Sequence, residues 1–170
     1  MKKCLVLVDF QNDFIDGSLG TLEAQSIVPA VLDKLAQYPK ETRLATMDTH
    51  FEDYLSTQEG KNLPVIHCQK DSPGWQIRKE AQVGFAQVFE KSSFGSIELA
   101  EYIRDSEFDE VELVGICTDI CVISNAFLIK VYAPEVKLVV DAACCAGVTV
   151  EKHLAALETM RSCQVEVVNS

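Results

Sequence analysis

The sequence lacks the features that mark several classes of protein. No apolar stretch approaches the length needed to cross a membrane, and no run of basic residues is present. Fifteen Lys and Arg stand against 26 Asp and Glu, a net charge of −11, so we expect neither a membrane nor a nucleic acid as partner. The apolar run near the N-terminus is interrupted by Asp9, unlike the core of a secretion signal, and we expect a cytoplasmic protein.

The sequence also lacks the cysteine pattern of a disulfide-stabilised protein. Its seven cysteines are an odd number without any Cys-x2-Cys pair, so a disulfide framework is not expected. Most of them are expected to pack as small apolar side chains, the usual state of a free cysteine. A cysteine with a chemical role must therefore be identified from its surroundings.

What the sequence does contain is the alternation of an α/β protein. Continuous apolar runs predict six strands, at 3–9, 42–48, 87–91, 110–116, 136–142 and 164–168. Helical patterns lie between several of them, at 24–38, 96–105, 119–132 and 149–162. This order predicts one domain over residues 1–170, with a parallel sheet between two layers of helices. Pro29 indicates that the first helix begins near that residue or is kinked there.

The carboxyl ends of the predicted strands hold most of the chemically reactive residues. In open parallel sheets, ligands bind outside these ends. The ends are formed here by Asp9, Asp48, Lys91, the segment 115–121 and Asp141. The long polar segment 48–86, which interrupts the alternation, is expected to be either functional or disordered.

Cys121 is the candidate nucleophile. Thr118 is predicted to cap the following helix, which places Cys121 in its first turn. There the helix dipole would lower the pKa of the thiol, and free N–H groups could stabilise an oxyanion. Asp9 and Lys91 end strands that could flank it, as base and as cation. The alternatives are a packing role for Cys121, a turn-capping Asp9 and a Lys91 that points into water.

Asp48, His50 and His67 form a second candidate site. Two of the three histidines in the chain lie near an acid at a strand end, and Asp48 and His50 share one side of an extended segment. Carboxylate and imidazole ligands suit Zn, Fe or Mn. The alternative is a polar loop whose histidines bind backbone groups. The third histidine, His153, is interpreted as a surface or packing residue.

Three segments resemble the signatures of one known superfamily, in the expected order: CLVLVDFQNDFIDG, VFEKSSFGS and GICTDICVISNA. With the candidate metal ligands, they make nearly the whole chain similar to the nicotinamidase branch of the isochorismatase-like cysteine hydrolases. The resemblance implies a three-layer α-β-α, Rossmann-like fold with a six-stranded parallel sheet. It also implies a catalytic triad, in which Asp9 accepts the proton, Lys91 balances the charge and Cys121 attacks.

The resemblance implies roles for the backbone and for an aromatic pocket as well. A cis peptide bond would precede Cys117, and the N–H groups of Cys117 and Cys121 would form the oxyanion hole. Phe14, Trp75 and Phe94 are the candidates to enclose a flat aromatic substrate.

A divalent metal, Zn or else Fe or Mn, is the cofactor that the resemblance implies. Its ligands would be Asp48, His50, His67 and a fourth side chain. Glu59 has the matching spacing after His50 and is our choice, with Glu52 and Asp53 as rivals.

The implied reaction is hydrolysis of a small carboxamide, nicotinamide to nicotinate and ammonia, through a thioester on Cys121, as in NAD salvage. The alternative within the superfamily is a metal-independent sister hydrolase acting on isochorismate or on carbamoyl or ureido amides. From another class, Cys117 with Cys121, or Cys144 with Cys145, could serve thiol redox chemistry or sensing. Members of the family commonly self-associate, which implies a homo-oligomer.

Overall fold

A six-stranded sheet forms the centre of the computed structural model, which describes residues 1–170. Its order is β3-β2-β1-β4-β5-β6, and every neighbouring pair is parallel. The strands are β1 (Lys3–Val8), β2 (Arg43–Asp48), β3 (Gln87–Lys91), β4 (Glu110–Ile116), β5 (Lys137–Ala146) and β6 (Glu166–Val168). The six predicted strands are confirmed, although β5 extends beyond its expected end at 142.

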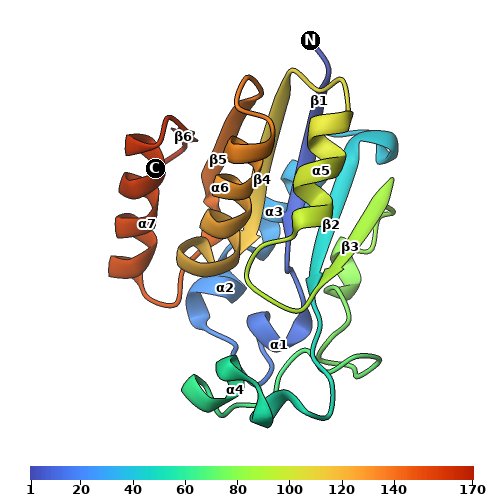
Figure 1. The fold of residues 1–170 in the computed structure, drawn as a ribbon, viewed down its shortest axis with the longest axis vertical. Helices are drawn as coiled ribbons and strands as arrows, with labels where there is room; N and C mark the ends of the chain where they lie inside the picture. Colours follow the sequence, from blue (N-terminus) through green and yellow to red (C-terminus); the bar gives the residue numbers. More distant parts are fainter.

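Helices cover both faces of the sheet, as Figure 1 shows. On one face lie α1 (Asn12–Ile15), α2 (Leu22–Ser26) and α3 (Val28–Ala36); on the other lie α5 (Ile97–Asp105), α6 (Ile123–Tyr132) and α7 (Val150–Ser162). The side chains of β1 alternate between these layers: Val6 and Val8 belong to the core under α5–α7, whereas Leu5 and Leu7 belong to the core under α1–α3. The three-layer α-β-α prediction is confirmed.

The remaining helix, α4 (Gln58–Asn62), lies in the long segment between β2 and β3, below the carboxyl ends of the strands in Figure 1. This segment is ordered around the crevice rather than extended into solvent. None of the helices is both long and apolar enough to cross a membrane.

The direction in which the sheet grows reverses between β3 and β4. From β1 the chain adds β2 and β3 on one side and then crosses over to place β4 on the other. The carboxyl ends of β1 and β4 therefore border the crevice in which such sheets bind ligands. The two strands approach closely here, because a Cβ on Gly115 would lie 2.1 Å from the carbonyl oxygen of Val8. The φ of Gly115 is +124°, so only glycine fits this position without strain.

Candidate active site

Four neighbouring strands each place one residue at the crevice. Lys91 and Asp48 are the last residues of β3 and β2 and are paired in register. Asp9 directly follows β1, and Cys117 directly follows β4. Cys121 lies one helical turn beyond Cys117. The structure thus brings together the residues that the sequence suggested for catalysis.

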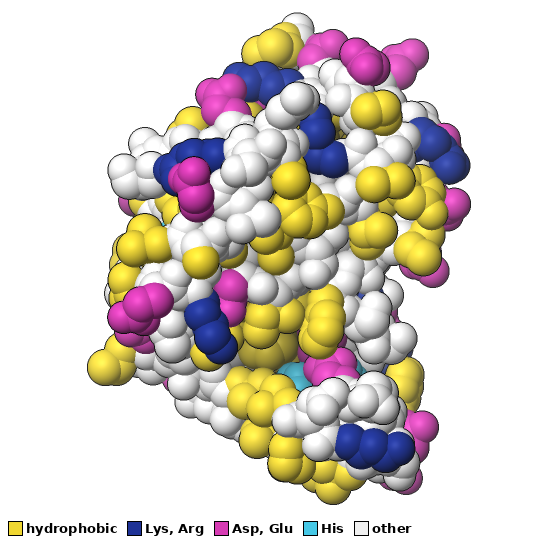
Figure 2. All heavy atoms as spheres, turned by 60° about the vertical axis from the view of Figure 1, so that its left-hand side comes forward, with side chains coloured by type: hydrophobic (Ala, Val, Ile, Leu, Met, Phe, Trp, Pro, Cys, Tyr) yellow, Lys and Arg dark blue, Asp and Glu magenta, His cyan; other side chains and the backbone are white.

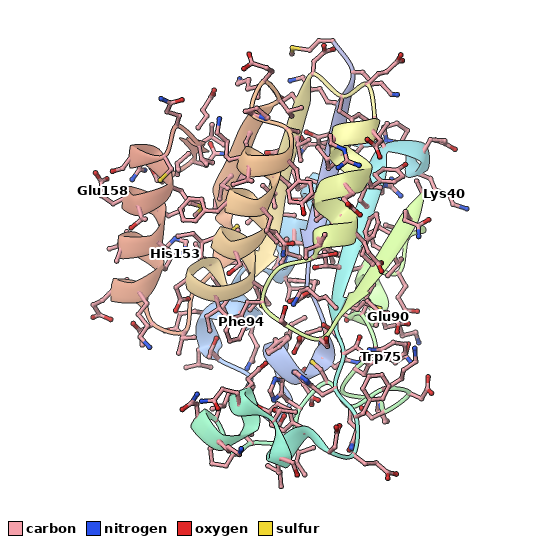
Figure 3. The ribbon with its side chains drawn as sticks, viewed as in Figure 1. Lys40, Trp75, Glu90, Phe94, His153 and Glu158 are labelled. Atoms are coloured by element: carbon pink, nitrogen blue, oxygen red, sulfur yellow. The ribbon has the colours of Figure 1, made fainter.

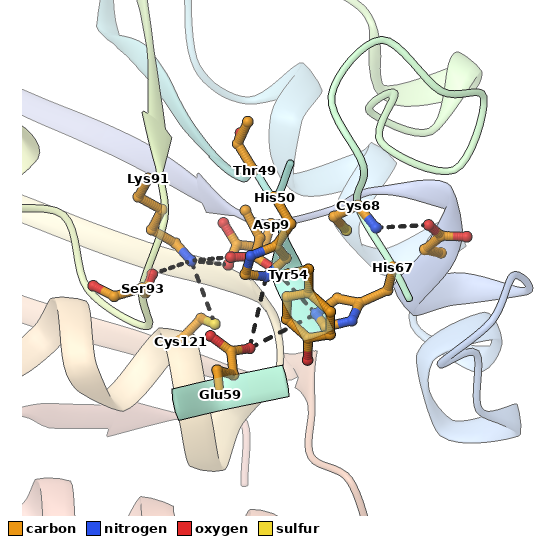
Figure 4. A network of polar contacts seen from close by, with 12 residues as sticks. Asp9, Thr49, His50, Tyr54, Glu59, His67, Cys68, Lys91, Ser93 and Cys121 are labelled. Carbon is orange, nitrogen blue, oxygen red and sulfur yellow. Dashed lines mark hydrogen bonds and ion pairs between the residues drawn. The ribbon is translucent and has the colours of Figure 1, made fainter. Parts of the chain in front are cut away.

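The ammonium group of Lys91 lies at the centre of this cluster (Figure 4). Its Nζ is 2.6 Å from Asp9 Oδ2, 3.5 Å from Cys121 Sγ and 3.5 Å from Asp48 Oδ1. It also donates a hydrogen bond of 2.9 Å to the carbonyl oxygen of Ser93. Burial alone would lower the pKa of Lys91, but the negative charge of Asp9 and the other acidic neighbours raise it. The side chain therefore remains a cation although it is buried.

Asp9 is completely buried, and each of its oxygens has a partner. Thr46 Oγ1 donates to Asp9 Oδ1 at 2.6 Å, and Oδ2 is ion-paired with Lys91 Nζ at 2.6 Å. Burial, opposed by the charge of Lys91, raises the pKa of Asp9 above the ordinary range of an aspartate. A buried carboxylate with a raised pKa is suited to accept a proton.

The thiol of Cys121 is buried in a turn that differs from the expected helix start. Residues Thr118–Val122 form a single π-helical turn that leads directly into α6. Burial, and then the charge of Asp9, raises the pKa of Cys121 well above its ordinary value. This direction is opposite to the one expected from the helix dipole, and its largest cause is the exclusion of water from the thiol. The resting side chain is then a thiol, and a base would have to remove its proton before the sulfur could attack.

Thr118 does not cap the helix, contrary to expectation. Its hydroxyl is hydrogen-bonded at 2.7 Å to Nδ1 of His153, and no side chain caps the turn. His153 is half-buried on α7 (Figure 3), so it links that helix to the turn that holds Cys121. The contact joins residues far apart in the sequence, and no local pattern could have indicated it.

The peptide bond between Ile116 and Cys117 is cis, as the resemblance implied. The N–H of Cys117 donates no hydrogen bond within the protein. Cys117 and Cys121 line the same cavity. A free N–H beside a thiol is what an oxyanion hole requires.

The candidate metal ligands also converge. Asp48 Oδ2 lies 2.9 Å from His50 Nε2 and 3.4 Å from His67 Nε2. Glu59 on α4 places its Oε1 3.6 Å and 3.8 Å from the same two nitrogens. The ligand atoms of Asp48, His50 and His67 lie within 4.8 Å of one another, and Glu59 lies beside the two histidines, next to the Lys91 cluster (Figure 4). Glu52 and Asp53, the rivals of Glu59, are exposed and form no ion pair with either histidine.

The chemistry of these donors fits a divalent metal. Nδ1 of His67 is 2.7 Å from the carbonyl oxygen of Val65, and a proton on Nδ1 leaves the lone pair of Nε2 free toward the cluster. Nε2 of His50 is buried without a hydrogen-bond partner, which a metal would supply. Although burial opposes it, the close contacts with both histidines and the charge of Lys91 hold the pKa of Asp48 below its usual range. Asp48 would therefore bind a metal as an anion.

A largely apolar cavity of about 280 Å³ opens beside Cys121 and the metal ligands. Phe14 and Phe94 line it, as predicted. Figure 2 shows a hollow with hydrophobic side chains around it and acidic and histidine side chains inside it. Trp75 does not line the cavity: it lies under the end of β3, away from Phe94 (Figure 3), and its Nε1 donates to Thr49 Oγ1 at 3.0 Å. The predicted pocket role of Trp75 is not supported.

Comparison with known proteins identifies the family. The isochorismatase domain model matches residues 3–170. A nicotinamidase/pyrazinamidase of Mycobacterium tuberculosis is 31% identical over 186 residues, which cover 99% of each chain.

Two solved structures share the fold. Pyrazinamidase of Pyrococcus horikoshii in complex with zinc matches with a TM-score of 0.82 at 24% identity over 100% of both chains. PnC1 from L. infantum in complex with nicotinate matches with a TM-score of 0.85 at 22% identity, over 98% of this chain and 92% of that one. The family model and the M. tuberculosis relative both match almost the entire sequence. This chain therefore belongs to the isochorismatase domain family and, within it, to the nicotinamidase branch.

Proposed function

We propose that this protein hydrolyses nicotinamide to nicotinate and ammonia through a thioester on Cys121. At the level of enzyme class, the family and the M. tuberculosis relative identify a hydrolase that acts on amide C–N bonds. The observation that carries the narrower proposal is one cavity that is bordered both by Cys121, in contact with Lys91, and by three of the candidate metal ligands, Asp48, Glu59 and His67. The nicotinate bound to the L. infantum protein of the same fold also supports it.

In the proposed reaction, Asp9 removes the proton of the Cys121 thiol, and the sulfur attacks the carboxamide carbon. The accepting atom is Asp9 Oδ2, because Oδ1 already accepts a hydrogen bond from Thr46. Lys91 stays protonated and balances first the charge on Asp9 and then that on the sulfur, because its Nζ contacts both. The N–H groups of Cys117 and Cys121 stabilise the oxyanion.

The second half of the reaction returns the residues to their starting state. Protonated Asp9 gives its proton to the leaving nitrogen, so that ammonia departs and a thioester remains on Cys121. Asp9 then takes a proton from the water that attacks the thioester. The product leaves as nicotinic acid while the thiol regains a proton from Asp9, and the carboxyl proton then passes through solvent to ammonia, which gives nicotinate and ammonium. No proton is gained or lost by the protein over the cycle.

Asp48, His50, Glu59 and His67 would hold a divalent metal. We propose zinc, because imidazole and carboxylate ligands suit it and because the pyrazinamidase of P. horikoshii contains it, although the same donors suit Fe or Mn. The metal would supply a Lewis acid for the ring nitrogen of a pyridine carboxamide. Phe14 would position the ring, since it lines the cavity and its own ring centroid lies 5.6 Å from that of His67.

Ammonia release from nicotinamide tests the proposal, with pyrazinamide, a ureido acid and an aliphatic amide assayed in parallel. Each assay is repeated after treatment with a chelator and after addition of zinc. We expect turnover of nicotinamide that chelation abolishes and zinc restores. A preference for the ureido acid that chelation does not affect would place the protein in a sister branch and remove the role of the metal. No turnover of any amide would contradict the proposed chemistry.

A further inference from the structure

The segment that follows Asp9 contacts both parts of the metal-ligand set, although it contributes no ligand itself. We propose that Gln11 and Asp13 are positioning residues that fix the backbone of Asp48 and of the segment after His67, and thereby set the affinity for the metal. The inference rests on the proposed function, because it assumes that these ligands bind a metal.

At the point where β1 ends, the side chain of Gln11 makes the hydrogen bonds to β2 that the main chain of a longer β1 would make. Asp9 has a φ of +46° and turns the chain away from β2, so no further residue of β1 can pair with the main chain of Asp48. The Gln11 side chain takes that place: its Nε2 donates to the carbonyl oxygen of Asp48 at 2.8 Å, and the N–H of Asp48 donates to its Oε1 at 2.8 Å. Nε2 also donates to the carbonyl oxygen of Trp75 at 2.8 Å. The completely buried amide therefore has both of its protons and its oxygen in use.

Asp13 holds the second part of the ligand set. Its Oδ2 accepts a hydrogen bond of 2.8 Å from the N–H of Cys68, the residue that follows His67. The N–H of Asp13 donates to the carbonyl oxygen of Gly74 at 3.0 Å, and a Cβ on Gly74 would lie 2.2 Å from Asp13 Oδ2. Gly74 thus allows the loop to pack directly against the carboxylate, which leaves Asp13 little freedom to move.

These contacts couple the position of the metal to that of the base. Asp48 is the last residue of β2, whereas His67 comes from the loop. The main chain of His50 holds the two segments together on one side, because its N–H donates to the carbonyl oxygen of Cys68 at 3.0 Å and its carbonyl oxygen accepts from Lys70 at 2.9 Å. Residues 9–13 hold them together on the other side, through side chains, and they also contain Asp9. Outer partners that orient metal ligands typically contribute a factor of about 10 to 100 in metal affinity. We expect Gln11 and Asp13 to contribute in that range.

The test measures the zinc dissociation constant of the full-length protein by competition with a chromogenic chelator, and unfolding of the metal-free protein by urea. We expect Gln11→Leu and Asp13→Ala each to raise the dissociation constant about 10- to 100-fold. Asp13→Asn keeps an oxygen that can accept from Cys68 and should restore the affinity to within a few-fold of wild type. Asn12→Ala is the matched control, because Asn12 Nδ2 donates only to the carbonyl oxygen of Pro73, and it should leave the affinity unchanged.

The experiment distinguishes failure of this inference from failure of the proposed metal site. Wild-type zinc affinity in both folded Gln11→Leu and folded Asp13→Ala would overturn the inference and leave the proposed function intact. A purely structural role would lower the urea midpoint while the folded protein kept its zinc affinity, and this result would also overturn it. A wild-type protein that binds no divalent metal would overturn the metal site and the inference together. If Gln11→Leu does not fold, the comparison of Asp13→Ala with Asp13→Asn decides the question.

Discussion

Replacing Lys91 with Met would remove the only cation that is paired with Asp9. The substitution keeps an unbranched side chain of similar length, so the main change is the loss of the charge. Lys91 Nζ lies 2.6 Å from Asp9 Oδ2, and the two side chains are 3% and 0% exposed. Solvent therefore screens the pair very little, and the carboxylate of Asp9 would be left buried and uncompensated.

The expected loss of stability is large because breaking a buried ion pair by removing one partner costs about 3–5 kcal/mol. A domain of this size is stable by about 5–15 kcal/mol, so at least about a fifth of the total would be lost. Asp9 can relieve the cost by taking a proton. Burial already raises its pKa, and loss of Lys91 would raise it further. A raised folded-state pKa contributes stability that is lost as the pH rises, so the deficit of the variant should be smaller in acid and widen toward alkaline pH.

Urea unfolding of wild type and Lys91→Met at about pH 5 and about pH 8 measures both quantities. Lys70→Met is the matched control, because Lys70 forms an exposed ion pair with Glu90 and its loss should not change stability measurably. A loss below about 1 kcal/mol at both pH values would refute the reasoning, since it would mean that Asp9 is solvated or paired elsewhere. Ammonia release should be abolished in the variant, as neither Asp9 nor the sulfur would have its counter-charge.

Four further substitutions and one pH profile test other parts of the site. Cys121→Ser should abolish ammonia release whereas Cys117→Ala, which keeps the backbone N–H, should retain most of it; equal loss in both would favour a thiol redox role. Glu59→Gln should weaken zinc binding at least about tenfold, measured by chelator competition, because it removes a charged ligand atom from the cluster; unchanged affinity would exclude Glu59 as a ligand. Gly115→Ala should lower the free energy of unfolding by at least about 2 kcal/mol, because its Cβ would overlap a main-chain oxygen of β1; a change near zero in urea unfolding would contradict the close approach. The acid limb of kcat/KM should lie above the pH range of an ordinary aspartate, because burial raises the pKa of Asp9; a limb within that range would assign the base elsewhere.

The sheet could be predicted from the sequence because strands that are buried on both faces read as continuous apolar runs. The observed bounds of β3 and β4 agree with those runs, and the others differ only at their ends. The helix predicted over 24–38 is in fact two helices, α2 and α3. Pro29 explains the break, since a residue without an N–H is accommodated in the first turn of a helix.

Part of the candidate site could be predicted, namely the residues that are placed by their position at a strand end or by their spacing in the sequence. Asp9, Asp48 and Lys91 end adjacent strands, so parallel pairing alone brings them together. The environment of Cys121 could not be predicted in the same way, because its pKa depends on how completely the surrounding layers exclude water. The bond between Thr118 and His153 depends on how α7 packs, which no local pattern records.

The position of Trp75 was missed for a similar reason. Its place depends on how the long loop folds back under β3, and the loop has no periodicity from which its path could be derived. Gln11 could have been noticed as a polar residue close to Asp9, but its contact with Asp48 depends on where β1 ends and turns away.

The four strand ends at the crevice have a consequence for the synthesis of the protein. β1, β2 and β3, with the loop between β2 and β3, leave the ribosome first and bring the proposed base, cation and metal ligands. The proposed nucleophile follows β4, which must enter on the other side of β1. A fragment that stops before β4 therefore has no sulfur at the crevice, and a sheet that has opened at β1 separates the sulfur from its base. Turnover should consequently disappear at the same urea concentration as tertiary structure, and a growing chain has no amidase activity until its central sheet is complete.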